Sequence, residues 1–188
     1  MNIEVILIFL RGIPTWAVII PLLFCSVLLL AVAIERIVFF HRIDIDYSAV
    51  VSANDFPINP VTEIIIRSKQ FREKNSSGYS NIIILYSEKA VRQMEKFIGT
   101  VSTIATVAPM IGLLGTVTGF MKSFNALASQ NSTSGLLASG ITEALLTTAL
   151  GLLVAIPAIV FHNYLVSKSA FFIKEIEYVA NFLSEEGK

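Results

Sequence analysis

Three long runs with almost no charged residues constrain this chain more than any other feature of its sequence. They cover residues 16–34, 97–121 and 136–167, and the third contains a single charged residue, Glu143. A helix that crosses a bilayer needs about 20 mainly apolar residues, and its backbone groups must be paired within the segment. Overall, 54% of the residues are apolar and 15% are charged, whereas soluble domains carry about 25% charged residues. The sequence therefore predicts an all-α membrane protein with three transmembrane helices, of which the second and third are long and extend into the cytoplasm.

The distribution of Lys and Arg predicts the orientation of these helices, because basic loops stay on the cytoplasmic side. Most basic residues lie in the connection after the first run, while the loop between the second and third runs has only Lys122 at its edge. We therefore expect the N-terminus outside and the C-terminus in the cytoplasm. The predicted segments are an N-terminal part with the first helix (1–40), a cytoplasmic loop with helical segments (41–96), the second transmembrane helix (97–124), a short outer loop (125–135), the third transmembrane helix (136–166) and a cytoplasmic tail (167–188).

The cytoplasmic loop contains its own helical signals. Asn59-Pro60 is typical of a helix start, which predicts a short helix over 60–73, and the polar run at 75–78 ends it. From about Asn81 no Gly-rich or Pro-containing break precedes Pro109, so the pattern predicts one continuous helix from near Asn81 to near Asn125 that projects below the membrane. The charged residues on its first turns form either a solvated face or pairs between subunits.

Several functional classes find no support in the composition. The net charge is zero, which gives no argument for nucleic-acid binding. Cys25 is the single cysteine and forms no intrachain disulfide, and Cys25, His41 and His162 lack the spacing of metal ligands. The sequence contains no nucleophile–base pair and no phosphate-binding loop, so we expect neither an enzyme nor a cofactor. The N-terminus lacks the features of a cleaved signal peptide, and we expect it to be retained.

Glu143 is the candidate functional residue. A carboxylate is costly in hydrocarbon, so an acid inside a membrane helix usually belongs to an ion or proton pathway. If the third helix begins near Leu136, Glu143 lies about two turns inside it. If the helix begins near Ser139 and Gly140, Glu143 lies at the outer interface, where the positive end of the helix dipole favours it. Both alternatives fit the sequence.

Small residues recur along one face of the second and third helices, which allows close helix–helix approach in lipid. The same spacing suits packing within one subunit or between copies of the protein. Prolines inside both helices predict kinks. The residues concerned are Ala108, Gly112, Gly115 and Gly119 in the second helix, Thr148, Gly151, Ala155 and Ala158 in the third, and the prolines Pro109 and Pro157. Thr147 lies four residues after Glu143 and hence on nearly the same face.

Residues 108–124, APMIGLLGTVTGFMKSF, resemble the second membrane helix of the MotA/TolQ/ExbB proton-channel family. Residues 140–164, GITEALLTTALGLLVAIPAIVFHNY, are similar to its third helix. The resemblance covers roughly 97–166, and three spans in a short chain look like the ExbB/TolQ branch. His162 departs from the tyrosine more common there, and we assign it no role.

This resemblance implies a homopentamer around an ExbD/TolR-like dimer, whose single membrane helix carries an aspartate, and a TonB/TolA-like energy-transfer protein. It also implies an ion pathway lined by Glu143, Thr116 and Thr148, with protons or sodium ions as the coupling ion. The location would be a bacterial inner membrane, with a periplasmic N-terminus and a cytoplasmic C-terminus. Outer-membrane import is the expected process. The alternatives are envelope maintenance of the TolQ type, a motility motor, or a passive membrane scaffold.

Overall fold

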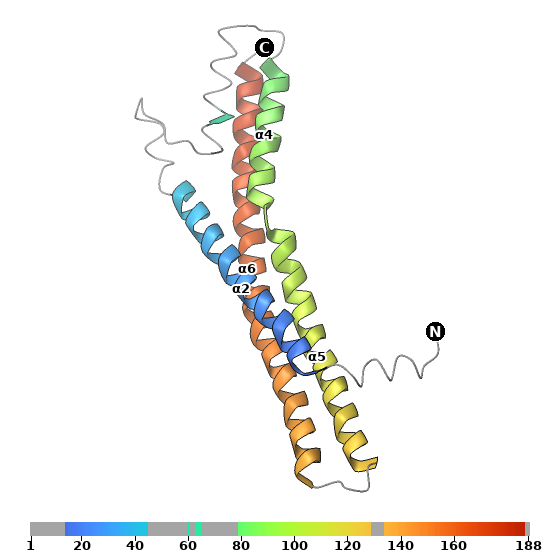
Figure 1. The fold of residues 1–188 in the computed structure, drawn as a ribbon. Coiled ribbons are helices and arrows are strands. Elements are labelled where there is room, and N and C mark those ends of the chain that lie inside the picture. The colour runs from blue at the N-terminus through green and yellow to red at the C-terminus, as the bar shows by residue number, and fades with distance from the viewer. Residues whose placement is uncertain (1–13, 45–59, 61–62, 65–78, 129–133, 187–188) are drawn as a thin grey trace, which may run out of the picture. The chain divides into compact units, whose positions relative to one another are not determined.

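The computed structural model describes residues 14–44, 60, 63–64, 79–128 and 134–186. Within these ranges the ordered structure is helical, with α2 at Trp16–Asp44, α4 at Tyr79–Glu95, α5 at Ile98–Ala128 and α6 at Ser134–Glu186 (Figure 1). Of the predicted helix over 60–73, the structure describes residues 60 and 63–64, which are helical. The remainder of that prediction, and the break predicted at 75–78, lie outside the described residues.

Three segments are long and apolar enough to cross a membrane, as the sequence predicted. They are Trp16–Ile43, Asn81–Ala128 and Leu137–Tyr178. Large apolar side chains such as Phe24 and Leu153 remain 67% and 68% exposed on these helices. Helices that are apolar on all sides suit hydrocarbon or the surfaces of other helices. The described residues therefore confirm an all-helical fold with three helices that are compatible with three transmembrane spans.

The helix predicted as continuous from near Asn81 to near Asn125 is interrupted, and this prediction was wrong. The chain makes a turn at Lys96 and Phe97 between α4 and α5, and Phe97 has a φ of 68°. This left-handed conformation commonly ends helices, but glycine is the usual residue there. The break was not foreseen because Phe97 carries none of the sequence signals of a helix end.

Side chains from two other helices bind the last carbonyls of α4, which a helix leaves without partners. The guanidinium of Arg36 in α2 donates to the Gln93 carbonyl oxygen over 2.9 Å. The hydroxyl of Ser169 in α6 donates to the Met94 carbonyl oxygen over 2.8 Å. The guanidinium also lies 5.4 Å from the centre of the Phe97 ring. These contacts stabilise the end of α4 and hold Phe97 in a conformation that its side chain disfavours.

The chain divides into two compact units, each built from separated parts of the sequence. The first comprises Met1–Val32 and Gly99–His162, and the second comprises Ala33–Ile98 and Asn163–Lys188. Helices α2 and α6 each contribute to both units.

In the first unit, α5 and α6 pack through glycines with almost no space between them. A Cβ at Gly151 would lie 2.8 Å from the Ala108 carbonyl oxygen, and one at Gly119 would lie 2.7 Å from the Ala144 Cβ. Beside this contact, Val18 and Leu22 of α2 join Ala108 and Ala155 in a buried apolar cluster. The small-residue faces of α5 and α6 therefore meet each other within one subunit.

The second unit has an aromatic and aliphatic interior. Phe40 of α2 stacks on Phe172 of α6 with ring centroids 5.8 Å apart, and Met94 and Ile176 are fully buried. Arg36 is 1% exposed, so the end of α2 brings a cation into this interior.

The first prediction concerns the glycine contact. Gly119→Ala should lower the free energy of unfolding by about 1–3 kcal/mol, because the added methyl meets the Gly140 carbonyl oxygen at 2.8 Å and overpacking costs that much. Gly99→Ala is the matched control: a Cβ there meets nothing within 4 Å, and alanine favours helix by up to about 1 kcal/mol. Thermal unfolding in detergent, followed by circular dichroism, measures both. Equal melting temperatures would contradict the close contact.

The second prediction concerns the end of α4. Ser169→Ala should destabilise the protein by about 1–3 kcal/mol, because it leaves a buried carbonyl without its donor. Ser87→Ala provides the control, since the Ser87 hydroxyl is buried without a hydrogen-bond partner and its removal should be neutral or stabilising. The same unfolding measurement applies. A Ser87 variant that loses as much stability as the Ser169 variant would refute the assigned capping role.

Candidate functional site

Two opposite charges stand alone in the first unit and lie next to each other. In the described residues of that unit, Lys122 and Glu143 are the only members of the Lys, Arg, Asp and Glu set. The Lys122 Nζ lies 3.1 Å from Glu143 Oε2. His162, the only histidine described in this unit, is 19 residues further along α6, about 28 Å at 1.5 Å per residue. The site is therefore a single ion pair in an apolar unit.

A hydroxyl completes the site. The Thr15 hydroxyl donates to Glu143 Oε2 over 2.7 Å, and the Lys122 ammonium donates to the same hydroxyl oxygen over 2.7 Å. The three side chains thus form a closed ring of three hydrogen bonds. Each comes from a different part of the chain: Thr15 precedes α2, Lys122 lies on α5 and Glu143 lies on α6.

Local structure explains why each side chain is available. The Thr15 carbonyl accepts hydrogen bonds from the amides of Val18 and Ile19, so Thr15 caps α2 through its backbone and its hydroxyl points elsewhere. Lys122 follows Gly119 by three residues and therefore lies on the α5 face that approaches α6. Glu143 lies next to Ala144, which contacts that face at Gly119.

The start of α6 lies closer to the first of the two helix starts that the sequence offered than to the second. The helix begins at Ser134, not near Ser139, so Glu143 lies nine residues inside it, about 13 Å along the axis. Its side chain is 41% exposed and that of Lys122 is 35% exposed. The pair is therefore open on one side, where an ion, water or a partner helix has access.

The hydroxyls of the two predicted pathway threonines, Thr116 and Thr148, donate to backbone carbonyl oxygens and not to Glu143. The Thr148 hydroxyl donates to the Gly112 carbonyl oxygen on α5 over 3.1 Å, and the Thr116 hydroxyl donates to the Leu113 carbonyl oxygen of its own helix over 2.6 Å. Both side chains are half-buried. Thr147, placed near the Glu143 face by the sequence, is 1% exposed and packs where a Cβ at Gly115 would clash.

The glycines and Ala155 that the sequence predicted for helix packing lie in contacts between helices. Gly112, Gly115, Gly119 and Gly151 lie at the contact between α5 and α6, and Ala155 belongs to the buried cluster. Helix α5 continues through Pro109, and helix α6 continues through Pro157. Within the described ranges, no three His, Cys, Asp or Glu side chains are grouped closely enough to hold a metal ion.

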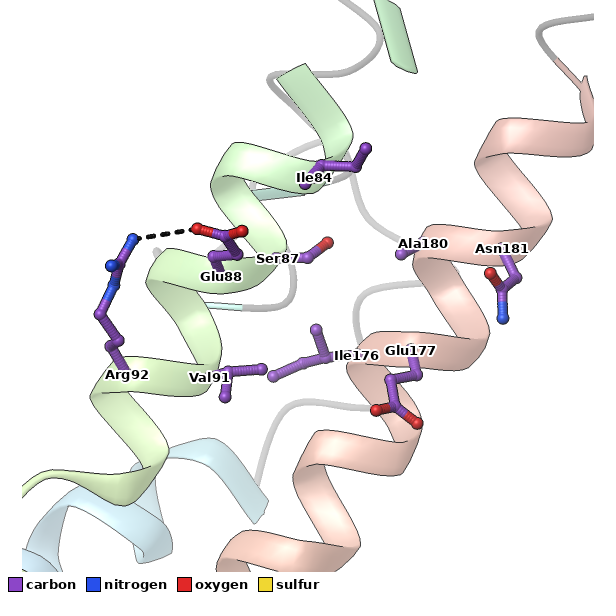
Figure 2. A pocket seen from close by; sticks show the side chains of 9 residues that line it. All are labelled: Ile84, Ser87, Glu88, Val91, Arg92, Ile176, Glu177, Ala180 and Asn181. Carbon is purple, nitrogen blue, oxygen red and sulfur yellow. Dashed lines mark hydrogen bonds and ion pairs between the residues drawn. The ribbon is translucent and has the colours of Figure 1, made fainter. Parts of the chain in front are cut away.

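A separate groove lies in the second unit, between α4 and α6, with a volume of about 570 Å³. Figure 2 shows Val91 and Ile176 facing each other across it. Glu88 and Arg92 on one rim are 3.4 Å apart and mostly exposed, as expected for a solvated face. The full lining is Ile84, Ser87, Glu88, Val91, Arg92, Ile176, Glu177, Ala180 and Asn181.

Sequence reasoning missed Lys122 and Thr15 as partners of Glu143. A signal for Lys122 was present, because it continues the Gly115–Gly119 face at helical spacing and is the sole basic residue between the second and third spans. No local pattern pointed to Thr15, which reaches Glu143 across 128 residues of sequence.

Three helices long and apolar enough to cross a membrane, with one charged pair among the described residues of the first unit, define the class of integral membrane proteins. Residues 58–178 match the MotA/TolQ/ExbB proton channel family, and the chain belongs to that family. It is 49% identical to the biopolymer transport protein ExbB of Pseudomonas putida over 73 residues, which are 38% of this chain and 22% of that protein. It is 42% identical to the Tol-Pal system protein TolQ of Haemophilus influenzae over 89 residues, 47% of this chain and 39% of TolQ.

A longer match extends over nearly the whole chain. The ExbB-like 1 protein of Synechocystis sp. is 30% identical over 202 residues, which cover 94% of this chain and 75% of that protein. The chain spans less than half the length of the ExbB and TolQ proteins named above. These relatives are named as transport and Tol-Pal proteins.

The third prediction compares the contributions of Thr116 and Thr148 to stability. Thr148→Val should weaken the first unit by about 0.6–1.5 kcal/mol, because it removes the hydrogen bond to Gly112 between helices. Thr116→Val should leave stability nearly unchanged, because its hydroxyl binds its own helix. Thermal unfolding in detergent distinguishes the two variants. Equal destabilisation would contradict the interhelical role of Thr148, whereas loss of transport in a stable Thr116 variant would support a place in the ion pathway.

Proposed function

We propose that this chain is the pore-forming subunit of an ExbB-like motor in a bacterial inner membrane. The motor would use the proton-motive force, together with an ExbD-like partner, to energise TonB-dependent import through the outer membrane. One observation carries the proposal: Glu143, the only acid described in the first unit, lies well inside α6 with an open side. Membership of a proton channel family supports it.

The proposed mechanism requires Glu143 to gain and lose a proton as access to it alternates. A proton that crosses a potential of 100 mV releases about 2.3 kcal/mol, so several protons are needed for each cycle of useful work. The hydroxyls of Thr116 and Thr148 are proposed to belong to the same pathway, and no cofactor takes part. Protons are the proposed coupling ion, and transport of sodium ions is an outcome that flux measurements test.

The proposed assembly is a homopentamer around an ExbD/TolR-like dimer with a membrane aspartate, which acts on a TonB/TolA-like protein. Exposed apolar side chains on α5 and α6, including Met110, Leu113 and Ile156, offer surfaces for neighbouring copies, the dimer and lipid. The proposed topology has a periplasmic N-terminus and a cytoplasmic C-terminus, following the distribution of basic residues.

A TolQ-like role in envelope integrity is the second candidate. The match to TolQ of Haemophilus influenzae is longer than the match to ExbB of Pseudomonas putida, at 89 against 73 residues. The TolQ-like role would use the same site to drive a different partner, so the two candidates differ in phenotype and not in chemistry.

The fourth prediction tests the proposed function. Glu143→Gln should abolish growth of the native host on an iron chelate as the iron source, because the amide cannot exchange a proton. Glu143→Asp is the matched control that keeps the carboxyl. Membrane levels and oligomeric state of both variants are measured alongside growth.

Each outcome has a distinct meaning. Normal growth of the Glu143→Gln strain together with sensitivity to detergent would favour the TolQ-like role. Normal growth with an intact envelope and normal motility would refute an ion-carrying role and leave a passive scaffold.

A further inference from the structure

We propose that Lys122 is a displaceable counter-ion of Glu143, held in place by Thr15, and that an incoming proton must release it. This inference rests on the proposed ion-carrying role of Glu143 and deepens it by naming what occupies the carboxylate between transport events. The geometry that carries it is the ring of hydrogen bonds among the three side chains.

The direction of the Lys122 side chain is the first argument. Lys122 lies six residues before the end of α5 at Ala128, and a lysine near a helix end normally extends toward water at the membrane surface. Here the ammonium instead binds Glu143 Oε2 at 3.1 Å and Thr15 Oγ1 at 2.7 Å. The first unit contains no other described carboxylate that it could bind, so this pairing is specific.

The exposure of the pair is the second argument. The two side chains are 35% and 41% exposed, and exposed ion pairs typically change equilibria by no more than about fivefold. A fully buried pair would be far harder to separate. This contact is therefore strong enough to occupy the carboxylate at rest and weak enough to open in every cycle.

The exchange step balances in atoms and charge. A hydronium ion gives its proton to the Glu143 carboxylate, which becomes a neutral carboxyl group, and one water molecule leaves. Lys122 keeps its proton throughout and loses the charge that held it. The site then carries a net charge of +1, which opposes the arrival of a second cation. When the carboxyl group passes its proton on, the ion pair forms again.

Thr15 has a positioning role in this arrangement. Its hydroxyl donates to the carboxylate and accepts from the ammonium, so it is bonded to both members of the ion pair. Because Thr15 also caps α2 through its backbone carbonyl, the state of the ion pair is linked to the beginning of α2.

The first part of the test uses the unmodified protein in native membranes. A water-soluble carbodiimide joins a carboxylate and an amine that are in direct contact, with loss of one water. The structure predicts a cross-link between the peptides that contain Lys122 and Glu143, detected by mass spectrometry. Absence of this cross-link, while the carbodiimide labels Glu143 with an added small amine, would overturn the proposal.

The second part measures how fast dicyclohexylcarbodiimide, which modifies protonated carboxyls in membranes, labels Glu143 at neutral pH. Lys122→Met should raise the labelling rate by roughly two- to fivefold, because the carboxylate loses its counter-ion. Lys122→Arg keeps the charge and should label like the unmodified protein, and Thr15→Val should lie between them. Glu143→Gln gives the background. Equal rates in the Lys122→Met variant and the unmodified protein would refute the counter-ion role.

These readouts separate the two proposals. Neither the cross-link nor the labelling rate depends on import, so both can succeed even if Glu143→Gln leaves growth normal and the proposed function fails. If Lys122→Met does not accumulate in membranes, the exchanged pair Lys122→Glu with Glu143→Lys replaces it. Recovery of accumulation in the exchanged pair supports the contact, and failure of the exchanged pair alongside normal accumulation of Glu143→Gln contradicts it.

Discussion

The close contact between α5 and α6 is the constraint on which the rest of the first unit depends. At Gly112 and Gly151 the two backbones approach so nearly that a Cβ would lie within about 3 Å of main-chain atoms. Such contact fixes the register of one helix against the other, because each glycine fits only opposite its own neighbour. That register brings Lys122 of α5 to Glu143 of α6. The ion pair is thus a consequence of the packing and not its cause.

The charged pair consists of the only Lys, Arg, Asp or Glu side chains among the described residues of the first unit. Lys122 and Glu143 are partly exposed, so their charges are neither fully desolvated nor freely hydrated. The proposed function requires the Glu143 carboxylate to change its protonation when its surroundings change. In the second unit the opposite solution is found: Arg36 is almost fully buried among aromatic rings, at 5.0 Å from the Phe39 ring centre, and supports the end of α4. Lys122 is thus part of the candidate functional site, whereas Arg36 stabilises the fold.

Much of the architecture could be predicted because membrane helices follow from length and polarity alone. Three candidate spans were clear from nearly uncharged runs, and α6 begins at Ser134, two residues before the apolar pattern at Leu136. The interruption at Phe97 could not be predicted, because it depends on donors from α2 and α6 that bind the carbonyls of α4. A left-handed phenylalanine is unfavourable by itself, and only contacts distant in sequence make it acceptable.

The same division holds for the candidate site. Sequence alone determined that Glu143 is an isolated acid in an apolar helix and that glycines line the neighbouring face, since charge and side-chain size are local properties. Tertiary structure alone decided which groups meet that acid. Thr15 is 128 residues away from it, and Lys122 is 21 residues away from it on a different helix. Pairing of this kind depends on the register of packed backbones, which no single segment of the sequence contains.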